Sequence, residues 1–136
     1  MSTQKLNIKF YQNIGKVFYA VAKSDNAVDT KEIEVLKKIV KEKWLAVDET
    51  FDVFGTDTAY QIEIVFDWLY SKNATSDDCY ADFIEYYHNH SFFFTREVKK
   101  LIMETSSSIA GAFAGKNKSE LMLLARLSLE FNQLAL

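Results

Sequence analysis

Residues 22–36, AKSDNAVDTKEIEVL, decide the fold because they end one amphipathic helix and begin the next. Before this stretch, apolar side chains recur at the spacing of one helical face, which predicts a helix from about residue 5 to about residue 23. Asp29 or Thr30 is then a suitable N-cap, and Glu32 stands where a capping box needs an acid. The second helix has an apolar face made of Ile33, Leu36, Ile39, Val40 and Trp44. The segment from Ser24 to Asp29 therefore predicts a short connection between two helices.

The rest of the chain predicts four more helices. Residues 46–56 lack a helical period and contain Gly55, which indicates a connection. The helix that follows carries Ile64 and Trp68 beside its main apolar face, and so wide a stripe predicts a central position. The fifth helix is expected to run through Phe113. Suitable caps for the four helices are Asp57 or Thr58, Ser76 with Asp77 and Asp78, Thr95, and Asn117 or Ser119.

Composition agrees with an all-helical chain. There is no proline and there are only 4 glycines in 136 residues, as expected for long helices with short connections. A hydrophobic content of 49% is enough to bury a core without disulfides or metals. We therefore expect residues 1–136 to form a single all-α domain, a compact bundle of about six helices.

Cysteine usage and charge restrict the setting and the partners. The single Cys79 cannot form an internal disulfide, which favours a reducing compartment and hence the cytoplasm. Residues 1–9 lack the apolar run of a targeting signal, and nowhere is an apolar run long enough to cross a bilayer. The net charge is −3, and no clustered basic face is present. We therefore expect neither membrane spanning nor nucleic-acid binding.

An internal comparison relates the two halves of the chain. A shift of 88 positions aligns Ala22 with Ala110, residues 30–36 with residues 118–124, and Ile39 with Leu127, without a gap. Each half then has a helix, a short polar break and a helix led by glutamate. The pattern suggests a bundle with two pseudo-symmetric helix pairs, although helical sequences also match over such lengths by chance.

The segment from Ala22 to Leu36 resembles the helix-turn-helix signature of the tellurite-resistance TerB-like family. In that signature an alanine-rich helix ends in Asp-Gly, and a hydrophobic residue, a capping residue and a glutamate follow. The matching positions here hold Asp25, Val28, Asp29 and Glu32, and Asn26 replaces the glycine. The second half departs from the pattern, because Ala114 to Glu120 keeps only the glutamate. The resemblance implies a compact all-helical protein that acts in stress and metal-linked responses.

The same resemblance implies a divalent cation site. Acidic residues at these turns are proposed to bind cations in the family, so Asp25, Asp29 and Glu32 become candidate oxygen ligands, with Glu120 facing them. Calcium, magnesium or manganese would suit such ligands. The spacing is not that of an EF-hand, because Thr30 stands where glycine is needed and Leu36 where a bidentate glutamate is needed. The alternative is structural: Asp29 and Glu32 form a capping box that needs no metal.

Histidines and aromatic residues supply the other candidates. His88 and His90 are two apart, so on a helix they point in different directions, and no cysteine or third histidine lies near them. The densest aromatic region ends in Phe92, Phe93 and Phe94. Three consecutive phenylalanines cannot all point inward from one helix. Part of the run is therefore a candidate surface for a partner protein or a homodimer, and the alternative is burial in the core.

Catalytic motifs are missing from the sequence. Cys79 and His88 have no glycine-rich turn near them to supply an oxyanion hole, and no phosphate-binding loop is present. We expect a non-enzymatic cytoplasmic module that binds a partner protein or a divalent cation. One alternative is a purely structural or self-associating helical domain without metal. A weaker alternative is a small metal-dependent hydrolase that uses Asp25 and Glu32 as ligands.

Overall fold

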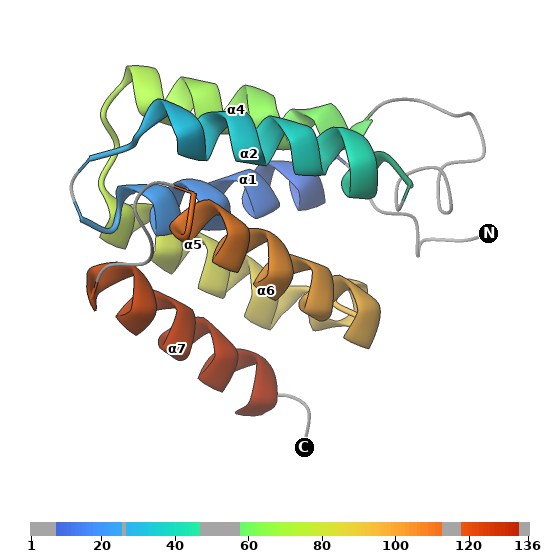
Figure 1. Ribbon diagram of the computed structural model, residues 1–136. Helices are drawn as coiled ribbons and strands as arrows, with labels where there is room; N and C mark the ends of the chain where they lie inside the picture. Colours follow the sequence, from blue (N-terminus) through green and yellow to red (C-terminus); the bar gives the residue numbers. More distant parts are fainter. Residues whose placement is uncertain (1–7, 26, 47–57, 113–117, 134–136) are drawn as a thin grey trace.

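The computed structural model describes residues 8–25, 27–46, 58–112 and 118–133. Within these ranges the chain forms six α-helices and no strand, which confirms the predicted all-α bundle (Figure 1). The helices are α1 (Ile8–Lys23), α2 (Thr30–Ile39), α4 (Gln61–Ser71), α5 (Ser76–Asn89), α6 (Arg96–Ala110) and α7 (Lys118–Gln133). A π-helical turn, η1 (Val40–Trp44), extends α2, and short 3-10 turns, η2 (Thr58–Tyr60) and η3 (Ser91–Phe93), precede α4 and α6. The predicted connection at residues 46–56, the caps Asp57 and Asn117, and Phe113 lie wholly or mostly outside the described residues.

Helix α1 occupies the centre of the bundle. It contacts α4, α5, α6 and α7, and every residue from Val17 to Ala22 is fully buried. The prediction that the helix containing Ile64 and Trp68 is central was wrong, because both side chains are 55% exposed on α4. An apolar stripe wider than one face does not require burial on all sides, since surfaces also carry apolar atoms.

Gly15 allows α1 and α4 to approach closely. A Cβ atom placed on Gly15 would lie 2.7 Å from the backbone oxygen of Ile62 and 3.2 Å from Cβ of Val65. A contact of 2.7 Å with a backbone atom is too short, so any larger residue would push the helices apart. The absence of a side chain at this position therefore sets the distance between the two helices.

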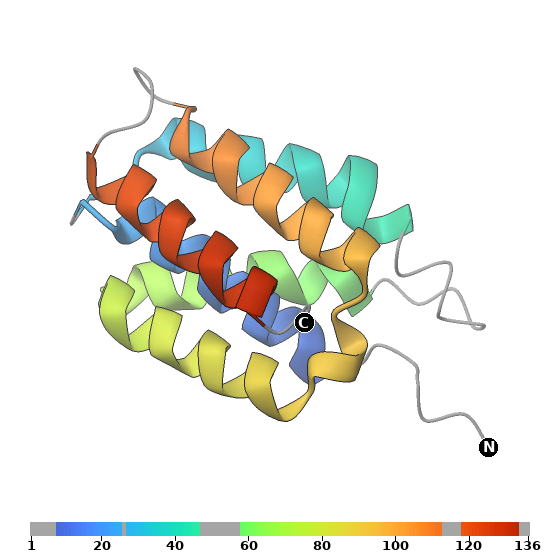
Figure 2. The ribbon, with the colours of Figure 1, turned by 90° about the horizontal axis from the view of Figure 1, so that it is seen from below.

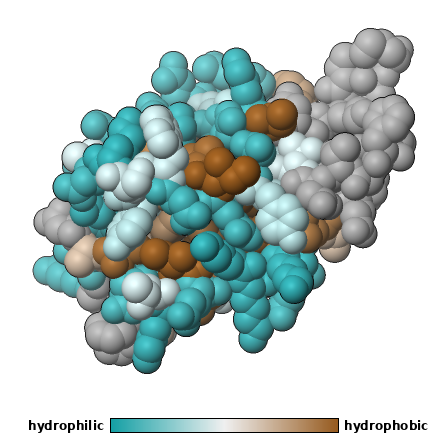
Figure 3. Space-filling view, turned by 90° about the horizontal axis from the view of Figure 1, so that it is seen from above, coloured by the Kyte–Doolittle hydropathy of each residue, from teal (hydrophilic) through white to brown (hydrophobic). Residues whose placement is uncertain are grey.

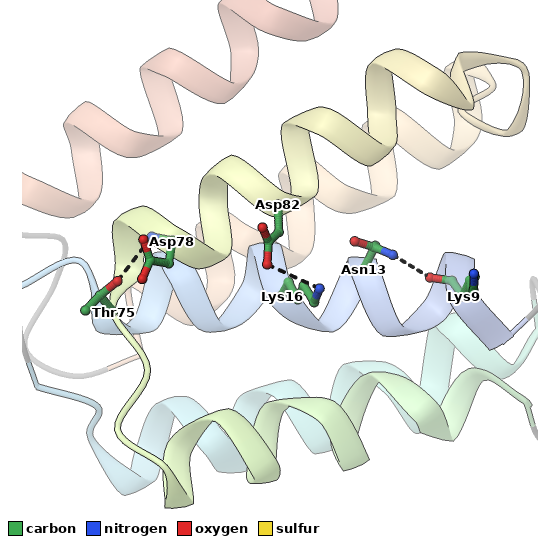
Figure 4. Close-up of polar contacts among 6 residues, drawn as sticks. All are labelled: Lys9, Asn13, Lys16, Thr75, Asp78 and Asp82. Atoms are coloured by element: carbon green, nitrogen blue, oxygen red, sulfur yellow. Dashed lines mark hydrogen bonds and ion pairs between the residues drawn. The ribbon is translucent and has the colours of Figure 1, made fainter.

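Polar contacts cap α5 and attach it to α1, and Figure 4 shows the cap at Thr75 and the ion pair between Lys16 of α1 and Asp82 of α5. The N-cap is Thr75, whose hydroxyl accepts a hydrogen bond from the Asp78 backbone N–H, and not Ser76 as predicted. Ser76 instead donates its hydroxyl to the carbonyl of Ala20 on α1, at 2.7 Å. Further along, Lys16 and Asp82 form an ion pair at 3.4 Å. The cap thus moved by one residue because a tertiary contact occupies the Ser76 hydroxyl.

Helix α6 packs against α1, α2 and α7. Thr95 caps it as predicted, by accepting a hydrogen bond from the Val98 backbone N–H. Helix α2 packs on α6, where Trp44 donates its indole N–H to the Thr105 hydroxyl at 3.1 Å. Helix α7 packs on α6 and α1 and covers the lower side of the bundle (Figure 2). None of the helices in the described residues is long and apolar enough to span a membrane.

The helices of the two pairs begin at matching positions. Helices α6 and α7 begin 88 positions after α1 and α2, as the internal comparison predicts for the second helix of each pair. Buried residues follow the same register: Ile14 and Ile102 correspond, as do Val21 and Ile109, and all four are fully buried. The first helices of the two pairs, α1 and α6, therefore bury equivalent faces.

Candidate functional site

The connection between α1 and α2 ends in a complete capping box. Asp29 has an extended backbone, and its carboxylate accepts a hydrogen bond from the Lys31 backbone N–H at 2.8 Å. In return, the Glu32 carboxylate accepts a hydrogen bond from the Asp29 backbone N–H at 2.7 Å. These bonds satisfy N–H groups that the first turn of a helix leaves without partners. The structural role predicted for Asp29 and Glu32 is therefore present.

Glu32 also meets Glu120 in the interior. The side chains of the two residues are hydrogen-bonded, and they are only 4% and 2% exposed. Each lies in the first turn of its helix, Glu32 in α2 and Glu120 in α7. The pKa of Glu32 is raised to about 8, mainly by burial. The Asp29 backbone hydrogen bond lowers this pKa, whereas the contact with Glu120 and the charge of Asp25 raise it. A buried carboxyl with this pKa is mostly protonated near neutral pH.

The structure brings together only part of the predicted ligand set. Asp25 is exposed, and its carboxylate accepts a hydrogen bond from the Ala27 backbone N–H at 3.1 Å. The Asp29 carboxylate binds the backbone of its own helix. In the part of the chain that the structure describes, no three histidine, cysteine, aspartate or glutamate side chains are grouped so as to hold a metal ion. Within the predicted set, the structure thus brings the side chains of Glu32 and Glu120 together.

The two histidines have separate partners. Nε2 of His88 lies 3.0 Å from a carboxylate oxygen of Glu130 on α7. His90 instead stacks on the ring of Tyr86, and its Nδ1 lies 3.1 Å from the Tyr86 carbonyl. They therefore do not converge on a common position.

The three consecutive phenylalanines divide between core and surface. Phe93 and Phe94 are buried, and the ring of Phe94 contacts those of Phe10 and Tyr87. Phe92 is 58% exposed. Of the predicted partner surface, only Phe92 is accessible, because the 3-10 turn directs its neighbours inward.

Cys79 is buried although its sequence neighbours are acidic. Desolvation, with the charge of Asp82 next, raises the pKa of the Cys79 thiol to about 11. A thiol with so high a pKa carries little thiolate near neutral pH, and the thiolate is the nucleophile.

A groove between α5 and α7 was not predicted from the sequence. Two open hollows, of about 720 and 490 Å³, adjoin each other at Asp77 and Arg126, and the two together are called the groove. Tyr80 and Ile84 of α5 line it, and Arg126 lies over the ring of Tyr80, 4.6 Å from the centroid. The lining residues of α5 recur every three or four positions, a signal visible in the sequence, but nothing there showed that this face borders α7.

No protein-family model, curated protein or solved structure matches this chain. The resemblance to the TerB-like family therefore stays a prediction.

Proposed function

We propose that this chain is a non-enzymatic helical module that binds a partner protein. The observation that supports this most is the outward surface of α7. Leu121, Met122 and Leu129 are each more than half exposed, although α7 already docks on the bundle through a second set of apolar residues. Single exposed apolar residues are ordinary, but several on one helix are typical of an interaction surface. On the face that carries α2 and α4, hydrophobic residues also reach the surface among hydrophilic ones (Figure 3), and Ile64 and Trp68 of α4 are each 55% exposed.

The proposed setting is the cytoplasm, in a stress response. The single cysteine, which is buried and cannot pair within the chain, supports a reducing compartment. The stress response rests on the resemblance of the Asp25–Glu32 segment to the TerB-like signature.

Crosslinked capture followed by reconstitution tests the partner. The wild-type chain and a variant with Leu121, Met122 and Leu129 replaced by serine would be compared. We expect one protein to be captured by the wild type and lost with the variant, and the purified pair to form a complex of fixed stoichiometry in light scattering. Thermal melting of the variant serves as the control for folding. If the purified proteins do not associate, or associate equally with a folded variant, the proposal is wrong.

A second candidate function is divalent cation binding at the Glu32–Glu120 pair. Two carboxylates held together away from water repel each other unless a proton or a cation neutralises them. A cation would need further oxygen ligands from backbone carbonyls or water.

Thermal melting in millimolar calcium, magnesium or manganese tests this site. A cation that binds only the folded state should raise the midpoint, and Glu32→Gln should abolish the rise. Glu34→Gln, an exposed carboxyl on the same helix, should keep it. No rise with any of the three cations, or an equal rise in Glu32→Gln, contradicts cation binding here.

Self-association through Phe92 is the remaining alternative, supported by its exposure. Light scattering over a range of concentrations would show a dimer that Phe92→Ser converts to a monomer. A chain that is monomeric at all concentrations contradicts this alternative.

A further inference from the structure

The groove between α5 and α7 has an apolar floor. The two helices are close at His88 and Glu130, whose side chains lie 3.0 Å apart, and the depression runs from there toward the start of both helices. Ile84 of α5 and Met122 of α7 supply accessible apolar surface along it, and Tyr80 and Leu123 lie beneath at 5% and 6% exposure. A floor of this kind binds through apolar contact, which an amphipathic helix provides.

The rim of the groove is acidic. Asp77, Glu85 and Glu130 line it, and among the described residues that line it Arg126 is the one arginine or lysine. Asp78 and Asp82, both exposed, add charge to the same helix, with Asp82 partly compensated by Lys16. Charge complementarity therefore favours an occupant that carries lysine or arginine beside its apolar stripe.

The length of the groove suits a helix. With 14 residues, α5 is roughly 21 Å long, the length of about four helical turns. A helix laid along it would present apolar residues at every third or fourth position to the floor.

We propose that the groove between α5 and α7 binds an amphipathic helix of the partner protein, with its apolar stripe on Ile84 and Met122 and its basic residues facing Asp77, Glu85 and Glu130. This inference rests on the proposed function: Met122 belongs both to the exposed surface of α7 and to the groove, and the acidic rim indicates the chemistry of the partner. Arg126 covers the ring of Tyr80 and opposes a basic occupant, so it limits the affinity of the groove.

Two labelled peptides serve as probes in fluorescence anisotropy. The first is a designed amphipathic helix of about 14 residues with a leucine stripe and flanking lysines, and the second replaces each lysine by glutamate. We expect saturable binding of the lysine peptide at one per chain, at least roughly tenfold tighter than the glutamate peptide. Equal affinity for the two peptides would overturn the proposal.

Variants locate the binding. Ala81→Trp fills the groove from an exposed position and should weaken the lysine peptide more than about tenfold. Glu85→Lys should weaken it roughly three- to tenfold, whereas Glu34→Lys, with the same change of net charge on α2, should have little effect. Arg126→Ala should tighten binding. If Glu34→Lys and Glu85→Lys weaken binding equally, the affinity of the peptide depends on the net charge of the protein and the groove is not its binding site.

Light scattering and binding of the captured partner show whether the groove holds a second copy of this chain or a partner protein. A concentration-dependent dimer that Ala81→Trp converts to a monomer would assign the groove to a second copy of this chain and overturn the proposal. A purified partner that binds folded Ala81→Trp as well as the wild type would also overturn it, and the proposed function would stand. If no partner forms a complex, the proposed function fails, and the peptide variants still decide the groove.

Discussion

The helix pairs α1–α2 and α6–α7 have the same spacing and the same buried register but different places in the bundle. Both place a buried glutamate in the first turn of their second helix, Glu32 and Glu120, and these two residues meet. Helix α1 is central, whereas α7 packs on α6 and α1 and leaves several large apolar side chains exposed. Matching sequence patterns therefore specify which face of a helix is buried, and the neighbours decide what the opposite face contacts.

The largest expected difference between the pairs is the loss of stability on substitution of Phe18 in α1, whose equivalent position in α6 is Ser106. Phe18 is fully buried and packs its ring edge against Trp44. Phe18→Ala should lower the free energy of unfolding by about 3–5 kcal/mol, because it removes apolar contact and leaves a cavity. Urea denaturation measures this loss. A loss below about 1 kcal/mol would mean that α1 is not the centre of the core.

The two helix pairs meet where Glu32 contacts Glu120, and this buried contact predicts that stability depends on pH. The folded-state pKa of Glu32, about 8, exceeds the ordinary value of 4.5, so the folded state binds the proton more tightly than the unfolded chain. The stabilisation is complete below about pH 4.5 and is lost as pH rises through about 8. The slope between these limits should reach about 1.4 kcal/mol per pH unit.

Denaturation at a series of pH values, with Glu32→Gln beside the wild type, measures this slope. Glutamine keeps a carbonyl oxygen that accepts the hydrogen bond from the Asp29 backbone N–H, and it has no proton to lose. The free energy of unfolding of the variant should therefore change less between pH 5 and pH 8 than that of the wild type. Glu34→Gln should leave the slope unchanged. Parallel curves for Glu32→Gln and the wild type would rule out titration of the buried pair.

A third difference lies in the two glycines, Gly15 within α1 and Gly111 at the end of α6. Gly15→Ala should destabilise the protein by about 1–3 kcal/mol, because the new Cβ meets the backbone of Ile62 and outweighs the gain in helix propensity. Gly111→Ala, at an exposed position with φ of −91°, should change stability little. Thermal melting of both variants compares them, and a stable Gly15→Ala would show that α1 and α4 can separate without cost.

The smallest effect is expected at Ser106. Its hydroxyl is buried and has no hydrogen-bond partner among the described residues. Ser106→Ala should therefore leave stability unchanged or raise it by up to about 1 kcal/mol, since an unsatisfied polar group is removed. Urea denaturation with Thr105→Ala as the contrast checks this, because that variant removes the acceptor of the Trp44 indole N–H and should be destabilised. A destabilised Ser106→Ala would indicate a hydrogen bond to a residue beyond those described.

Local chemistry made much of the fold predictable. The capping box of Asp29 with Glu32 and the cap at Thr95 depend on residues within one helical turn, and both were correctly predicted. The cap of α5 was predicted one residue late, because the hydroxyl of Ser76 binds α1 through a contact that spans 56 positions. Of the candidate site, the sequence predicted the facing of Glu32 and Glu120 by resemblance, but it did not indicate the groove beside α7.

Periodicity, caps and the absence of proline determined that this chain is a helical bundle and where most of its helices begin, because these effects act within a few residues along the backbone. Only the tertiary structure decided that α1 and not α4 is central, that Phe92 is exposed while Phe94 is buried, and that α5 and α7 border a groove. These features depend on which helices pack together, and a helical face looks the same in the sequence whether it meets a neighbour, solvent or a partner.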